Sequence, residues 1–209
     1  MLHKKFLIAL IALMSLNMAA FADEETLRYE VQRNGKPIGT HEVGFERKGE
    51  RLTVEVETDV RVKIAFLTVY RFAHEAEEQW QNGKLTSYHS KTDDNGTDKF
   101  LNLGLAGNTY TVDGSAGRLE AADMALPASL WHKATATQEQ LMNTLDGHNM
   151  AVFIEDAGLQ TIKAAGKNIE ARHFIMSGEL QRELWYADER LVRVKFFGED
   201  GSTIEYELQ

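Results

Sequence analysis

The chain has 209 residues, no cysteine, two prolines and a formal net charge of −9. This length is sufficient for one domain with a sizeable core. The negative charge argues against nucleic-acid binding and against adhesion to anionic lipid headgroups. The lack of cysteine excludes disulfides and thiol chemistry, so core packing must hold the fold together.

The N-terminal residues have the organisation of an export signal. A basic start, Met1–Lys5, precedes an apolar run, Phe6–Met18, and the small-x-small sequence Ala20-Phe21-Ala22. The apolar run is short for a membrane span, and acidic sequence follows at once. We expect a signal peptide at 1–22, cleaved after Ala22, and a single β-barrel-like domain at 23–209. The mature chain is then secreted to the periplasm, without a transmembrane segment.

Short runs of alternating apolar and polar residues follow, and they predict an all-β domain. The clearest run spans 52–64, where apolar side chains alternate with charged ones, as in a strand with one buried face. Residues 65–68 break this register and predict a kink or an exposed connection. Turns are expected at Asn-Gly and Gly-containing pairs. Alternating runs lie at 26–33, 38–47, 52–64, 69–81, 85–92, 97–103, 109–112, 118–120, 150–154, 162–164, 169–176, 180–186, 191–197 and 203–208.

These runs contain no βαβ unit and no fixed repeat, so we expect hairpins in a meander. Glycines inside a strand, at Gly39 and Gly44, indicate bends of the kind a curved sheet needs. The prediction is a mainly β fold: one curved antiparallel sheet of about eleven strands that forms an open or half β-barrel.

The composition changes between 127 and 145, where a short helical insertion is expected. A helical turn is predicted at Ala128–His132, and a helix at Thr135–Leu145 whose apolar side chains share one face. A strand is the competing interpretation of the second segment. Either form could cover the open end of the barrel.

The strand that ends in Asn82-Gly83 carries the strongest candidates for a binding site. Its alternation places aromatic and polar side chains on one face, and these, with two other tryptophans, could line a cavity. The same residues could equally be a filled core. The candidate ligand-binding residues are Tyr70, Phe72, His74, Glu78, Trp80, Trp131 and Trp185.

Other chemistry has weaker support. His74 and Glu78 are four residues apart on a strand, roughly 13 Å, which is too far to ligate one ion. Residues 93–98 superficially resemble a calcium loop but fit a hairpin turn better, because the twelfth position holds glycine. A hydrolase would have to use Ser129 and His132, which lack a placed acid. No catalytic residue, metal site or cofactor is therefore predicted.

Five segments carry a resemblance to a known family: NGKPIGTHEVGF, VYRFAHEAEEQWQNGKL, KTDDNG, LPASLWH and LWYADERLVRVKFFGEDGSTIEYEL. They resemble an uncharacterised family of exported Gram-negative proteins, catalogued as a domain of unknown function. The C-terminal pattern is also similar to periplasmic half-barrel proteins of the lipoprotein-carrier type. That resemblance implies a curved sheet with an apolar concave face and carriage of lipid or acyl chains.

Three functions follow from these readings. The first is a non-enzymatic periplasmic binding protein for a lipid-like or other apolar small molecule. The second is an envelope interaction or assembly module, with a filled barrel and an unidentified protein partner. The third is a hydrolase that uses Ser129 and His132.

Overall fold

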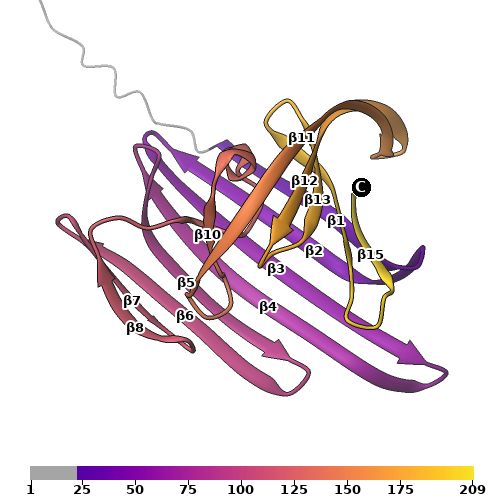
Figure 1. Cartoon of the computed structure of the whole chain (residues 1–209), viewed down its shortest axis with the longest axis horizontal. Coiled ribbons are helices and arrows are strands. Elements are labelled where there is room, and N and C mark those ends of the chain that lie inside the picture. The colour runs from indigo at the N-terminus through magenta and orange to yellow at the C-terminus, as the bar shows by residue number, and fades with distance from the viewer. Residues whose placement is uncertain (1–22) are drawn as a thin grey trace, which may run out of the picture.

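The computed structural model describes residues 23–209; the expected signal peptide lies outside them. Its strands form one sheet in the order β8-β7-β6-β5-β4-β3-β2-β1-β15-β14-β13-β12-β11-β10-β9 (Figure 1). All neighbours are antiparallel except β9 and β10, which are parallel. The bounds are β1 Asp23–Arg33, β2 Lys36–Lys48, β3 Arg51–Ile64, β4 Leu67–Gln81, β5 Lys84–Asp94, β6 Thr97–Ala106, β7 Thr109–Gly114, β8 Gly117–Ala121, β9 Leu126–Pro127, β10 Gln140–Met142, β11 Asn149–Ala164, β12 Lys167–Gly178, β13 Arg182–Ala187, β14 Arg190–Phe197 and β15 Thr203–Leu208.

The mainly β, curved and antiparallel prediction is confirmed, but the predicted number of strands is wrong. Residues 23–209 form fifteen strands rather than about eleven. The additional strands include the short β9 and β10, and β10 lies where a helix was expected. The sheet ends at β8 on one side and β9 on the other, and these edges do not pair, so the barrel stays open.

The hairpin turns follow the sequence signals closely. Asn34, Asn82 and Asn95 have positive φ angles, and each is followed by a glycine that also has a positive φ. This is the backbone that two-residue hairpin turns require. The expected exposed connection after β3 is a turn at Ala65-Phe66, where Ala65 has a φ of 54°.

The turn predicted at Ala157-Gly158 is wrong. β11 runs without interruption through these residues, and its register against β12 shifts between Asp156 and Gly158. Gly158 has a φ of 86°, and its N–H donates to Asp156 Oδ1 at 2.9 Å. A bulge therefore absorbs the glycine that the sequence pattern assigned to a turn.

The helical prediction for 127–145 is wrong in its main part. The helical residues are a 3₁₀ helix, Lys133–Thr137, and the second segment forms β10, as the competing strand interpretation held. Leu141 and Met142 are adjacent and both fully buried. Since adjacent side chains of a strand point to opposite faces, β10 is covered on both sides.

Residues 128–132, which we call the strap, form no helical turn. The strap connects two separate parts of the sheet, around β13 and around β4, through two hydrogen bonds. The Tyr186 hydroxyl on β13 donates to the Leu130 carbonyl at 2.6 Å. In the other part of the sheet, Trp131 Nε1 donates to Glu78 on β4 at 3.1 Å. Leu130 has a φ of 66°, which is unfavourable for a residue with a branched side chain. These two contacts hold the strap in its strained conformation.

The loop after β10 contacts the concave face of the sheet, which is the inner face of the open barrel. The Ser90 hydroxyl donates to the Thr144 carbonyl at 2.6 Å, and the Ala116 N–H donates to the Asp146 carbonyl at 3.2 Å. A Cβ on Gly114 would lie 2.2 Å from that Asp146 oxygen, so only glycine permits this approach. The strap and this loop therefore cover the inner face of β4–β7.

Candidate functional site

Glu78 lies at the centre of the inner face. It is 0% exposed, and its Oε2 accepts hydrogen bonds from Trp80 Nε1 at 2.8 Å and Trp131 Nε1 at 3.1 Å. Its Oε1 has no hydrogen-bond partner among the described residues. Burial raises the pKa of Glu78, and the nearby polar groups of Ser129, Trp80 and Trp131 partly oppose this.

A second buried polar atom faces the same region. Tyr88 on β5 is the Cα partner of Glu78 on β4, and its hydroxyl also has no hydrogen-bond partner within residues 23–209. Burial, together with the charge of Glu78, raises the pKa of Tyr88 well above its usual value. Buried polar atoms are normally paired, so two orphaned oxygens on facing residues mark this as a polar site within an apolar core.

Aromatic rings surround the Glu78 carboxyl. The Trp131 ring makes edge contacts with Trp80 at 5.7 Å and with Phe45 at 5.4 Å between centroids. The His132 ring lies 5.0 Å from Trp131 and 5.7 Å from Trp80. We call Glu78, Trp80, Trp131 and His132 the inner cluster. It joins strand β4 to the strap.

A pocket of about 320 Å³ opens beside the inner cluster. Its lining comes from Trp80 on β4, the β4–β5 turn, the start of β5, Tyr110 on β7 and residues 123–126. The Lys84 ammonium group lies 5.4 Å from the centre of the Tyr110 ring. The lining residues are Trp80, Gly83, Lys84, Leu85, Tyr110, Asp123, Met124, Ala125 and Leu126. The pocket thus has apolar walls, with Lys84 and Asp123 as its charged groups.

The remaining candidates on β4 lie toward its other end. His74 Nδ1 is 2.8 Å from Thr92 Oγ1, and the Phe72 ring stacks on the His74 ring at 6.2 Å. Tyr70 donates to Asp94 at 2.9 Å. Burial lowers the pKa of His74 to about 4. These three residues share the face of Glu78 but do not line the pocket.

Trp185 lies in the same hydrophobic core as Trp80 but has different aromatic and polar partners. Its ring stacks on His173 at 4.3 Å, and its Nε1 donates to Gln160 Oε1 at 2.9 Å. Its neighbour Tyr186 reaches the strap, so alternation along β13 directs Trp185 to the other face. The structure therefore brings Glu78, Trp80 and Trp131 together and leaves Trp185 apart.

The residues of the hydrolase hypothesis are close in sequence but do not form a nucleophile–base pair. Among the described residues, Ser129 and His132 share no hydrogen bond, and His132 Nδ1 accepts the Ala134 N–H at 3.1 Å. Burial also lowers the pKa of His132. No group of three or more His, Asp or Glu in residues 23–209 is arranged to hold a metal ion.

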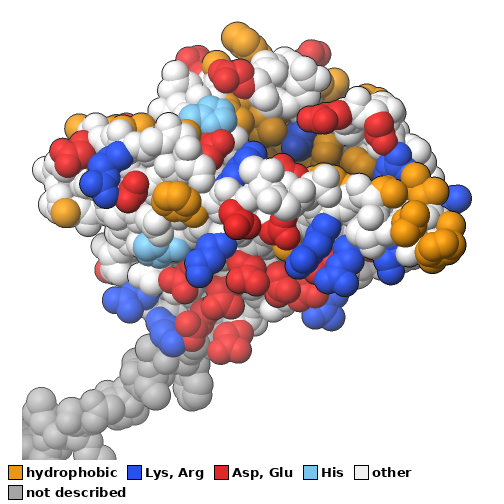
Figure 2. Space-filling model, turned by 90° about the horizontal axis from the view of Figure 1, so that it is seen from below, with side chains coloured by type: hydrophobic (Ala, Val, Ile, Leu, Met, Phe, Trp, Pro, Cys, Tyr) orange, Lys and Arg blue, Asp and Glu red, His pale blue; other side chains and the backbone are white. Residues whose placement is uncertain are grey.

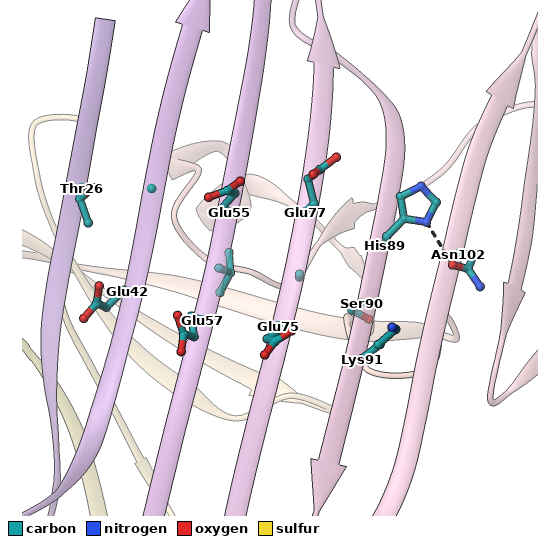
Figure 3. Close-up of a pocket in the computed structure, with 13 residues that line it drawn as sticks. Thr26, Glu42, Glu55, Glu57, Glu75, Glu77, His89, Ser90, Lys91 and Asn102 are labelled. Carbon is teal, nitrogen blue, oxygen red and sulfur yellow. Dashed lines mark hydrogen bonds between the residues drawn. The ribbon is translucent and has the colours of Figure 1, made fainter.

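A shallow depression of about 510 Å³ lies on the outer face, across β1–β6 (Figure 3). Figure 2 shows acidic side chains gathered on one side of the molecule. In the depression, Glu57 is the Cα partner of both Glu42 and Glu75, and Glu55 is the partner of Glu77. Like charges directly opposite each other on a sheet are destabilising. The like-charge pairs on this face therefore lower the stability of the fold.

The fold and its inner face define a class: β proteins with one long antiparallel sheet curled into an open barrel. The chain belongs to the family described as "Domain of unknown function (DUF6134)", whose sequence pattern matches residues 29–209. No curated protein matches the chain.

A solved structure supports the same class. The chain is similar to a β-barrel-like protein of a domain of unknown function, DUF1849, from Brucella abortus. The TM-score is 0.57 and the sequence identity is 12%, with 88% of this chain and 94% of the other covered. At this identity the likeness shows the fold alone. Within residues 23–209, no helix has the length and apolar composition needed to cross a membrane.

The pocket includes residues that the sequence analysis did not select. Leu85 and Tyr110 come from strands that were predicted correctly, but nothing in their local patterns showed that they face Trp80. The apolar triplet Met124-Ala125-Leu126, which follows Asp123, was the available signal for the remaining wall.

Proposed function

We propose that this protein binds an apolar or amphipathic small ligand, without chemistry of its own, in the pocket beside Trp80. The observation that carries the proposal is the pocket itself. Its volume of about 320 Å³ is at the lower end of ligand pockets, which run from roughly 300 to 1,000 Å³. Such a volume suits part of an acyl chain or one ring system.

The chemistry of the lining favours an amphipathic molecule. Trp80, Leu85, Met124 and Leu126 provide apolar surface for the body of the ligand. Lys84 provides a cation for a carboxylate or phosphate headgroup. A lipid-like anion with its tail inward therefore matches the pocket better than a sugar or a nucleotide. The export signal expected at 1–22 supports a periplasmic location for this binding.

The test is a titration of the protein with a brominated fatty acid, which quenches tryptophan fluorescence on contact. Trp80 lines the pocket and Trp185 does not, so Trp80→Phe should remove most of the quenching. Trp185→Phe should leave it in place. Equal quenching in both variants would contradict binding in this pocket.

A blocking variant provides an independent test. Ala125 lines the pocket, so Ala125→Trp should fill it and abolish uptake of the fatty acid. Ala106 is exposed near the end of β6, so Ala106→Trp is the matched control and should bind like the parent. Failure of both the parent and the control to take up the ligand would contradict the proposal. Co-purification of a stoichiometric envelope protein would then support the interaction-module hypothesis.

A further inference from the structure

The β3–β4 hairpin ends in a cluster of exposed apolar side chains. Phe66 is 90% exposed and Leu67 is 60% exposed, and Ile64 and Val69 beside them are also exposed. Figure 2 shows an apolar patch at one extremity of the molecule, and Figure 1 places the β3–β4 turn at that extremity. We call residues 64–69 the apolar tip.

The apolar tip projects beyond the strands on either side. The last pairs to the neighbouring strands are Gly39↔Val60 on β2 and Phe72↔Asp94 on β5. Beyond these, β3 and β4 pair only with each other, ending at Ile64↔Leu67, although the Asn95 N–H still donates to the Arg71 carbonyl at 2.8 Å. The three pairs beyond Arg71, at about 3.3 Å per residue, span roughly 10 Å. The tip is a convex finger rather than a groove.

Folding does not account for the residues in the turn. Other hairpins of the sheet use pairs such as Asn34-Gly35 and Asn82-Gly83, which suit a positive φ. Here Ala65 takes the positive φ, where it lacks the conformational freedom of glycine, and Phe66 follows it almost fully exposed to solvent. Local backbone preference and solubility would both favour polar residues.

Charge is also segregated in this hairpin. The sequence from Val60 to Phe72 contains three basic residues and no acidic residue, in a chain whose net charge is −9. Arg61 and Arg71 pair with aspartates at the base of the hairpin, at 2.8 Å and 3.6 Å. Lys63, nearest the tip, forms no ion pair among the described residues.

We propose that the apolar tip inserts into a lipid bilayer that contains anionic lipids. An apolar finger with basic residues behind it is complementary to a membrane surface, where apolar side chains enter the interface and cations meet headgroup phosphates. Interfacial segments bury their apolar face by about 5–10 Å, which the projection of the hairpin permits without contact by the acidic outer face. The net charge of the whole chain argues against membrane adhesion, but Lys63 places one positive charge, unpaired among the described residues, directly behind the tip.

The absence of native cysteine allows a site-specific test in the full chain. An environment-sensitive fluorophore attached at Phe66→Cys should shift to the blue and gain intensity with vesicles of 70% phosphatidylcholine and 30% phosphatidylglycerol. The matched control is Phe153→Cys on β11, because Phe153 is also 72% exposed. Its label should not respond. Since each signal is local to the label, attachment through another segment cannot produce this result.

Unlabelled variants measure the contribution of each group in vesicle co-sedimentation. Phe66→Ser should weaken binding about tenfold or more, because it removes an aromatic ring from the bilayer. Lys63→Gln should weaken binding roughly fivefold, and only to vesicles with phosphatidylglycerol. Phe153→Ser should bind like the parent. Thermal melts should show that all three variants fold.

Three results would overturn the proposal. The first is the absence of a blue shift at position 66 with either vesicle composition at low salt. The second is an equal response of labels at 66 and 153. The third is a dimer in sedimentation analysis that Phe66→Ser dissociates, because the tip would then contact a second copy of the chain.

Discussion

The two ends of strand β4 differ in what the sheet does with their aromatic side chains. At the Gln81 end, Trp80 is buried against the strap and the pocket, and the strand closes in a polar Asn82-Gly83 turn. At the Leu67 end, the apolar tip extends into solvent beyond its neighbouring strands. One strand thus carries an inward-facing aromatic site and an outward-facing one.

The difference follows from what lies opposite each end. The strap and the loop after β10 cover the inner face near Trp80, whereas the end of the hairpin pairs with no third strand. The ends are about 45 Å apart along a 15-residue strand. On our two proposals, a bilayer contact at the tip leaves the pocket remote from the membrane. The tip is then an anchor and not the entrance for the ligand.

The largest predicted contrast is in stability. Trp131→Ala should lower the free energy of unfolding by about 3–5 kcal/mol, because it removes ring packing and a hydrogen bond to buried Glu78. Phe66→Ser should change it by less than about 0.5 kcal/mol, since the ring is exposed. Chemical denaturation of both variants measures this. A larger loss in Phe66→Ser would show that the tip packs against the domain.

The histidines of the inner face should set the acid sensitivity. Burial lowers the pKa of His41 to about 3 and of His74 to about 4, below the ordinary value of 6.5. Between pH 6.5 and pH 4 the unfolded chain therefore binds protons that the folded chain does not bind. The free energy of unfolding falls as the pH drops through this range. His74→Gln should reduce the loss of unfolding free energy at pH 4 by on the order of 3 kcal/mol.

Melting temperatures of His74→Gln and the parent between pH 4 and pH 7 check this prediction. His89→Gln is the control, because His89 is exposed on the outer face. Parallel curves for His74→Gln and the parent would mean that His74 takes up a proton in the folded state as readily as in the unfolded chain.

Glu78 should have the opposite pH dependence. Burial raises its pKa above the ordinary 4.5, so the folded state favours the protonated carboxyl. Its contribution to stability is then complete below pH 4.5 and is lost as the pH rises through the pKa of the folded state. Glu78→Gln removes this loss, so its melting temperature relative to the parent should increase from pH 5 to pH 9. Glu77→Gln, on the outer face, is the control. A constant offset for Glu78→Gln would refute the account.

The smallest predicted effect is on the outer face between the two ends. Glu57→Lys would replace two like-charge pairs, with Glu42 and Glu75, by two opposite-charge pairs. Each pair contributes roughly 0.2–1 kcal/mol, so the melting temperature should rise by a few degrees. Glu120→Lys on β8, which faces Thr111, should have little effect. Equal melting temperatures for Glu57→Lys and the parent would show that solvent screens the cluster.

The sequence predicts those parts of the molecule that local chemistry determines. Alternation assigns the faces of β3 and β4 correctly, because a buried face repeats every two residues. Asn-Gly pairs locate hairpin turns for the same local reason. The contact of Glu78 with Trp80 also follows, since residues two apart on a strand share a face.

The parts that distant contacts determine could not be predicted in this way. The strap has no periodic pattern, and its path depends on Tyr186 and Glu78, which lie far away in the sequence. The sequence did not distinguish Trp185 from Trp131 as a candidate cavity residue. Only the fold shows that Trp185 lies on the face of β13 opposite to Tyr186, which contacts the strap. The pocket wall from Tyr110 likewise depends on how the strands curl.

The most direct test of the central claim is native mass spectrometry of the protein purified from an exporting host, followed by solvent extraction. We expect a reproducible additional mass that extracts as a lipid-like molecule and is absent from Ala125→Trp. A clean unliganded mass for the parent, with no uptake of added fatty acid or phospholipid, would contradict it.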